Sequence, residues 1–88
     1  MGFEKTVGIG AVVQKCNVSE KQLRYWQDAG YVEPEKVVCG ERTYRRYRES
    51  DVALIMEIKR LLDEGFTLSN ATKMAKINIE EKRNEKKN

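Results

Sequence analysis

The sequence contains no histidine, a single proline, and two cysteines among its 88 residues. Cys16 and Cys39 lie 23 positions apart, a separation that matches neither a zinc-finger spacing nor a CxxC redox pair. This pattern argues against a four-ligand zinc site within one chain. We therefore predict two reduced thiols, with Cys16 partly packed, and no metal or cofactor. A redox or metal-sensing role across a dimer is the alternative.

Long hydrophobic runs are also absent. No apolar stretch approaches the roughly 20 residues needed to cross a bilayer, and residues 1–6 lack the apolar core of an export signal. We therefore expect a cytoplasmic protein without membrane association. The acidic residues follow no catalytic pairing, and nothing resembles a glycine-rich loop for phosphate. No catalytic residue is predicted, and we do not expect an enzyme.

Charge is distributed unevenly along the chain. The length provides for one domain, and 40% hydrophobic with 35% charged residues is typical of a globular protein with a charged surface. The net charge is only +3. Residues 36–48, however, include one acidic residue, Glu41, and five basic ones: Lys36, Arg42, Arg45, Arg46 and Arg48. Such a block, with tyrosines between the charges, is typical of an element that binds phosphate.

Two short helices separated by a tight turn are predicted near the N-terminus. Apolar residues recur at helical spacing over residues 9–15, and Asn17 can adopt the left-handed conformation that ends a helix. Ser19 is a typical N-cap, and Gln22 completes a capping box. The helix that follows is expected to reach about Ala29 and to end at Gly30. Two helices so arranged form a helix-turn-helix.

The remaining segments predict a hairpin and two further helices. Residues 36–38 and 43–47 are rich in β-branched and aromatic residues and flank a turn that contains Gly40, as in a wing. Ser50 and Asp51 begin a third helix that Gly65 ends, and Thr67 caps a short fourth one. We therefore predict a mainly α fold with a small β-hairpin, a winged helix-turn-helix, over residues 1–76. Residues 77–88 are predicted to be a charged, disordered tail.

The second helix has two distinct faces. Leu23 and Trp26 lie three positions apart and should be buried, together with Val18 and Val32. The opposite face combines four residues at helical spacing: Lys21, Arg24, Tyr25 and Asp28. A stripe of this kind on the second helix of the motif can read the major groove, since arginine bonds guanine edges and lysine neutralises phosphate. Its alternative interpretation is an ordinary solvated face.

Alternation along the second hairpin strand separates its side chains. Tyr44 and Arg46 share one side of the strand, and Arg45 and Tyr47 share the other. Three arginines lie around one turn: Arg42, Arg45 and Arg46. Their positive charges repel each other unless an anion lies between them. The alternative is that one tyrosine is part of the core and the arginines are ordinary edge-strand charges.

Several segments stand in a specific order along roughly residues 7–74: Ile9-Gly10, Val18-Ser19, Leu23-Arg24-Tyr25-Trp26, Gly30-Tyr31-Val32-Glu33-Pro34, Tyr44-Arg45-Arg46-Tyr47, Ser50-Asp51-Val52, and Ile58-Lys59 through Gly65-Phe66. Each segment is weak evidence alone, but the ordered set is specific. It resembles the DNA-binding domain of the MerR family of bacterial regulators. Among the subgroups, it looks most like the short glutamine-synthetase-repressor type, by Ile9-Gly10, Gln14, the Arg24-Tyr25 pair, and Asp51-Val52 with Glu57-Ile58-Lys59.

The resemblance implies a transcription regulator that binds double-stranded DNA at an inverted-repeat operator, as a homodimer, and that bends or untwists the DNA. By position, it implies that the second helix lies in the major groove and that Arg45 of the wing contacts the backbone. The predicted DNA-binding residues are Lys21, Arg24, Tyr25, Arg42, Tyr44, Arg45 and Arg46.

The sequence also departs from the family pattern. Most members continue into a long dimerisation helix and often an effector domain, but no heptad seam follows Lys76 here. The resemblance therefore implies no particular effector, and we expect either a short regulator that dimerises weakly or on DNA, or a piece of a longer one. Trp26 replaces the more usual second tyrosine, which would remove a hydroxyl contact to phosphate.

The same features are compatible with two alternatives to a regulator. A phage-type excision or DNA-architectural factor could use the same winged fold to bend DNA. A protein-interaction module could use the surface around Tyr25 and Trp26 to bind a partner protein.

Overall fold

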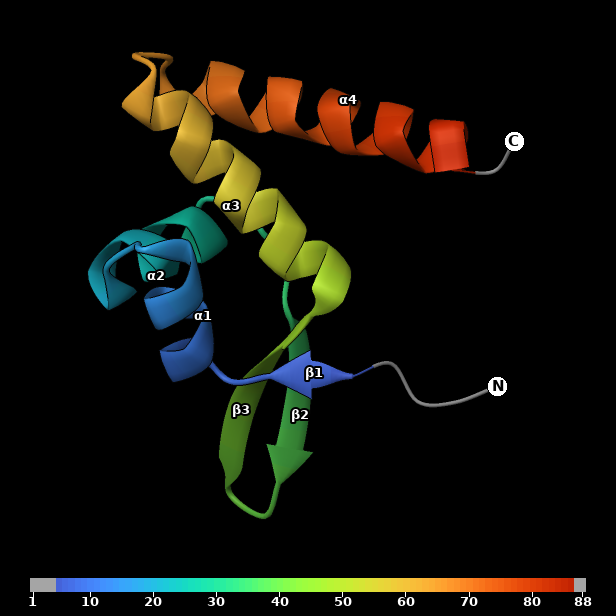
Figure 1. Ribbon diagram of the computed structural model, residues 1–88. Coiled ribbons are helices and arrows are strands. Elements are labelled where there is room, and N and C mark those ends of the chain that lie inside the picture. Colours follow the sequence, from blue (N-terminus) through green and yellow to red (C-terminus); the bar gives the residue numbers. More distant parts are fainter. Residues whose placement is uncertain (1–4, 87–88) are drawn as a thin grey trace.

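The computed structural model describes residues 5–86, and four helices and three strands follow one another in this part of the chain (Figure 1). Their order is β1 (Thr6–Val7), α1 (Ile9–Cys16), α2 (Glu20–Asp28), β2 (Glu35–Cys39), β3 (Arg42–Arg48), α3 (Glu49–Asp63) and α4 (Leu68–Lys86). The β2–β3 hairpin projects away from the helices, and α3 lies between the α1–α2 pair and α4 (Figure 1). The predicted winged helix-turn-helix is confirmed.

The turn between α1 and α2 forms as the sequence predicts. Asn17 ends α1 in the left-handed conformation, with a φ of 55°. The Ser19 hydroxyl accepts a hydrogen bond from the Gln22 backbone N–H at 3.0 Å, and the Gln22 side chain accepts one from the Ser19 N–H at 3.5 Å. This capping box fixes where α2 begins. Gly30, with a φ of 85°, follows its end.

The sheet is antiparallel, with β3 in the centre and β1 and β2 on either side. Gly40 and Glu41 form the two-residue turn of the hairpin, and the φ of 65° at Gly40 is a conformation that suits glycine. The sequence did not predict β1. Two residues are too few to show the alternation by which a strand is recognised, and β1 is defined only by its pairing of Thr6 with Arg48 and of Val7 with Tyr47.

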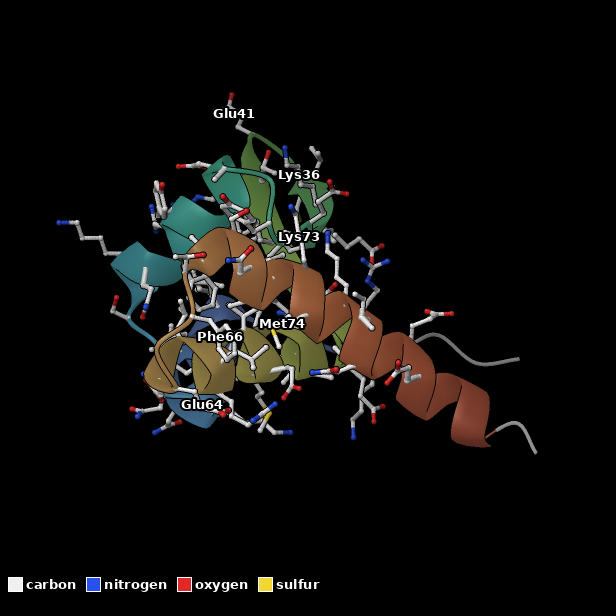
Figure 2. All side chains as sticks on the ribbon, turned by 90° about the horizontal axis from the view of Figure 1, so that it is seen from above. Lys36, Glu41, Glu64, Phe66, Lys73 and Met74 are labelled. Carbon is white, nitrogen blue, oxygen red and sulfur yellow. The ribbon has the colours of Figure 1, made fainter. Side chains whose placement is uncertain are left out.

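The core lies where α1, α2, α3 and the base of β3 meet. Its largest fully buried side chains are Trp26, Tyr47, Leu23, Ile55, Ile58, Val12 and Val32. Trp26 is only 2% exposed, which confirms its predicted place in the core. Alanines of α4, Ala71 and Ala75, complete the cluster against α3. Met74 of α4 lies between these two helices, and Phe66 lies in the loop that joins them (Figure 2).

Helix α4 is longer than the short fourth helix that the sequence predicts. The sequence predicts a frayed helix end that passes into a charged, disordered tail over residues 77–88, and α4 extends from Leu68 to Lys86. One cause is a contact with α3 that composition does not reveal: the Asn78 side-chain amide donates to Glu57 Oε2 at 2.9 Å. The predicted boundary at residue 76 therefore falls inside α4. Residues 87–88 lie outside the described residues.

Among residues 5–86, no helix combines the length and the apolar character that a membrane span requires.

Candidate nucleic-acid interface

One face of α2 is exposed and the other is buried, as the spacing predicted. Leu23 is fully buried, whereas Tyr25 is 61% exposed. The exposed face forms an open, shallow surface lined by Glu20, Lys21, Arg24, Tyr25 and Asp28. The structure thus brings together the three predicted site residues of this helix on one side. It also shows that Trp26 is turned into the core, so it contributes nothing to a surface that a partner protein could bind.

Arg24 forms an ion pair on this face that the sequence analysis missed. Its guanidinium Nη2 lies 2.8 Å from Oε1 of Glu20, one turn earlier, and both side chains are more than half exposed. The sequence does indicate this pair, because an acidic residue stands four positions before a basic one, and this spacing favours ion pairs on a helix. The guanidinium is therefore held over the first turn of α2.

The strand register sets the faces of the hairpin. Lys36 pairs with Arg45, and Val37 pairs with Tyr44. Directly paired residues of an antiparallel ladder point to the same side, so Lys36 and Arg45 add two positive charges to one face. Tyr44 is 47% exposed on the other face. Arg42, paired with Cys39, lies next to the turn and is also exposed.

Two arginines of the basic block have partners within the fold. Arg46 donates from Nε to the Thr6 hydroxyl at 3.2 Å and from Nη2 to the Thr6 carbonyl oxygen at 3.1 Å. Arg48 pairs with Asp51 at 3.0 Å and also donates to the Glu33 carbonyl oxygen. Arg46 therefore links β1 to the central strand, β3, by two hydrogen bonds. These bonds could not be predicted from the sequence because β1 itself was not predicted. The exposed cations of the hairpin are Lys36, Arg42 and Arg45.

Tyr47 connects the hairpin to α2. Its side chain is fully buried, and its hydroxyl accepts a hydrogen bond from the Gln27 side-chain amide. Burial raises the pKa of Tyr47, and three neighbours oppose that rise: the Gln27 hydrogen bond and the charges of Arg45 and Arg24. The charge of Asp51 adds to the rise. Because Arg24 precedes Gln27 by three residues on α2 and Arg45 precedes Tyr47 by two on β3, the Gln27–Tyr47 hydrogen bond brings together the parts of the two elements that carry these arginines.

The two cysteines differ sharply in environment. Cys16 is 5% exposed, and its Sγ lies 3.9 Å from the Val52 carbonyl oxygen. Burial raises the pKa of the Cys16 thiol, only partly offset by Lys15. Cys39 is exposed at the end of β2. Within the part of the chain that the structure describes, no group of three or more histidine, cysteine or acidic side chains could hold a metal ion.

Comparison with known proteins gives a consistent result. Residues 8–76 match the family described as MerR HTH family regulatory protein. The chain is 36% identical to the mercuric resistance operon regulatory protein of Bacillus cereus over 67 residues, which are 75% of this chain and 48% of that protein. It is 33% identical to the HTH-type transcriptional repressor CarH of Myxococcus xanthus over 72 residues, 81% of this chain and 23% of CarH.

A third relative is the heavy metal-dependent transcription regulator 2 of Rhizobium meliloti (strain 1021), 31% identical over 62 residues, 70% of this chain and 41% of that protein. The chain spans less than half the length of each of these three relatives. By their names, the three relatives are a regulatory protein, a transcriptional repressor and a transcription regulator.

Proposed function

The chain belongs to the MerR family of helix-turn-helix regulatory proteins, and we propose that it is a DNA-binding transcription regulator in which α2 reads the major groove while the β2–β3 hairpin holds the neighbouring phosphates. The observation that carries this proposal is the hydrogen bond between Gln27 of α2 and Tyr47 of β3. Arg24 stands three residues before Gln27, and Arg45 stands two residues before Tyr47. A helix and a hairpin joined there can engage one DNA duplex as a single rigid unit.

Chemistry assigns different tasks to the two elements. On α2, Arg24 and Tyr25 stand on an exposed helical face that can enter the groove, where arginine donates to guanine O6 and N7. The hairpin exposes cations beside the apolar side chains of Val37, Val38 and Tyr44. Its exposed cations, Lys36, Arg42 and Arg45, neutralise phosphates, which adds affinity that is independent of sequence.

We further propose that two chains bind an inverted-repeat operator. One α2 covers only a few base pairs, and a second copy on a symmetric half-site supplies the affinity that one small domain lacks. A role in bending DNA as an architectural factor would use the same surfaces. The family match favours a promoter regulator over that alternative.

Selection of preferred sites from random duplex DNA tests this function. We expect a palindromic winner that binds two chains, with half-sites spaced by about one helical turn, and with loss of binding when Arg24 is replaced by alanine. Selection that returns no preferred sequence from the wild-type protein would contradict the proposed function. A winning duplex that binds one chain would retain the DNA-binding assignment and contradict the dimer.

A further inference from the structure

Two carboxylates lie on the face of α2 that we assign to DNA. Glu20 and Asp28 line the same shallow surface as Lys21, Arg24 and Tyr25. A carboxylate near a phosphate backbone is repelled, whereas one that meets the edges of bases can accept a hydrogen bond from them. In the major groove, the donor that a carboxylate can accept from is an exocyclic amino group, above all N4 of cytosine.

Glu20 is the carboxylate that is coupled to the reading residue. Its Oε1 lies 2.8 Å from Nη2 of Arg24, with 54% of the Glu20 side chain and 62% of the Arg24 side chain exposed. Arginine and glutamate held together form a donor beside an acceptor. A G·C pair presents the complementary pattern in the major groove, with acceptors at guanine N7 and O6 and a donor at cytosine N4.

The start of α2 does not depend on Glu20. Ser19 and Gln22 already form the capping box, and the helix dipole requires only a negative charge in the first turn. Aspartate would supply that charge equally well. The longer glutamate side chain also reaches Arg24, and the pair so formed presents a carboxylate and a guanidinium side by side on the exposed face.

We propose that Glu20 is a specificity-determining residue: its carboxylate accepts a hydrogen bond from a cytosine amino group while Arg24 donates to guanine, in the same or the adjacent base pair. This inference rests on the proposed function, since it concerns the same face of α2. In the free protein the exposed ion pair orients both side chains. On DNA each partner exchanges part of that pair for a base edge.

Three variants separate base reading from charge and from helix stability. Glu20→Gln is neutral, and its amide can both accept and donate, so it no longer distinguishes cytosine N4 from thymine O4. Glu20→Asp keeps the charge at the first turn but is one methylene shorter, so its carboxylate reaches less far from the helix. Asp28→Asn is the matched control, because it removes one negative charge from the same face, two turns away from Glu20.

The experiment measures the affinity of each protein for the selected duplex and for a panel in which every base pair is replaced in turn. Replacement of one C·G pair should lower the affinity of the wild type for the duplex about 10-fold. The same replacement should lower the affinity of Glu20→Gln and of Glu20→Asp only about twofold, while the effects of replacing the other base pairs stay unchanged. Asp28→Asn should keep the wild-type pattern and bind all duplexes more tightly. Thermal melts confirm that the variants fold.

Glu20 variants that keep the full wild-type pattern of base preference would overturn the inference. That result is distinguishable from a failure of the proposed function, in which the wild-type protein itself shows no base preference at any position.

Discussion

The Gln27 side-chain amide of α2 donates a hydrogen bond to the Tyr47 hydroxyl of β3, across 20 positions of sequence. Tyr47 is fully buried, so this contact is a fixed joint between the helix and the hairpin. Because Arg24 precedes Gln27 by three residues and Arg45 precedes Tyr47 by two, the joint sets the relative position of the two cations that we assign to DNA.

Replacing Tyr47 by phenylalanine should therefore affect stability and binding together. Loss of the hydroxyl leaves the half-buried Gln27 amide without its partner, which should lower the free energy of unfolding by about 1–3 kcal/mol. Chemical denaturation measures this change. Tyr44→Phe is the matched control, since Tyr44 lies on the same strand but is 47% exposed, and its stability should be unchanged. Equal effects of the two variants would contradict a buried joint at Tyr47.

Tyr47 should also be the last tyrosine to ionise. Burial raises the pKa of Tyr47 above the ordinary value of about 10, despite the hydrogen bond from Gln27 and the positive charges nearby. In the unfolded chain the phenol ionises at its ordinary pKa. The buried, neutral phenol of Tyr47 therefore makes its full contribution to the free energy of unfolding below about pH 10. This contribution is lost as the pH rises through the higher pKa that Tyr47 has in the folded protein.

An ultraviolet titration of tyrosinate, followed in parallel with circular dichroism, measures this order of ionisation. We expect one late phase that coincides with loss of structure and that disappears in Tyr47→Phe. A late phase that persists in that variant would show that a different tyrosine is shielded.

Thiol reagents should distinguish the two cysteines. Cys39 is exposed and should react within minutes at neutral pH, whereas Cys16 is 5% exposed and its pKa is raised by burial, so little thiolate forms there. Mass spectrometry after brief alkylation should find one label, on Cys39, and a second only in denaturant. Rapid labelling of Cys16 in the folded protein would contradict its packing against α3.

Much of the fold could be predicted because local chemistry and tertiary packing agree there. Asn17, the Ser19–Gln22 box and Gly30 each determine a helix end by a local hydrogen bond or backbone conformation, and these predictions are confirmed. The burial of Trp26 followed from helical spacing alone. The exposed face of α2 followed for the same reason, whereas its role in binding DNA stays a prediction.

Features that depend on distant residues could not be predicted. The bonds from Arg46 to Thr6 require β1, which exists only through its pairing with β3. The joint between Gln27 and Tyr47 requires the packing of a helix against a strand. The length of α4 also depends on distant residues and could not be predicted, because composition alone favoured disorder after Lys76.

The end of α4 provides a test of that explanation. Asn78 donates to Glu57 of α3, so Asn78→Ala should loosen the helix beyond this point and lower overall stability by about 1 kcal/mol. Hydrogen exchange should become faster over residues 79–86 and stay unchanged in α1 and α2. Lys76→Ala, at an exposed position of the same helix, is the control. Unchanged exchange in Asn78→Ala would mean that the contact with Glu57 does not hold α4.

The most direct test of the DNA-binding surface is the salt dependence of affinity for the selected duplex, measured by fluorescence anisotropy for the wild type and for Arg45→Ala. With about five phosphates neutralised per chain, the logarithm of the binding constant should fall with the logarithm of salt concentration at a slope of about −4 to −5. Arg45→Ala should bind all sequences more weakly and reduce the slope by about one. An affinity that hardly changes with salt, or an unchanged slope in Arg45→Ala, would contradict an interface in which α2 and the hairpin bind DNA together.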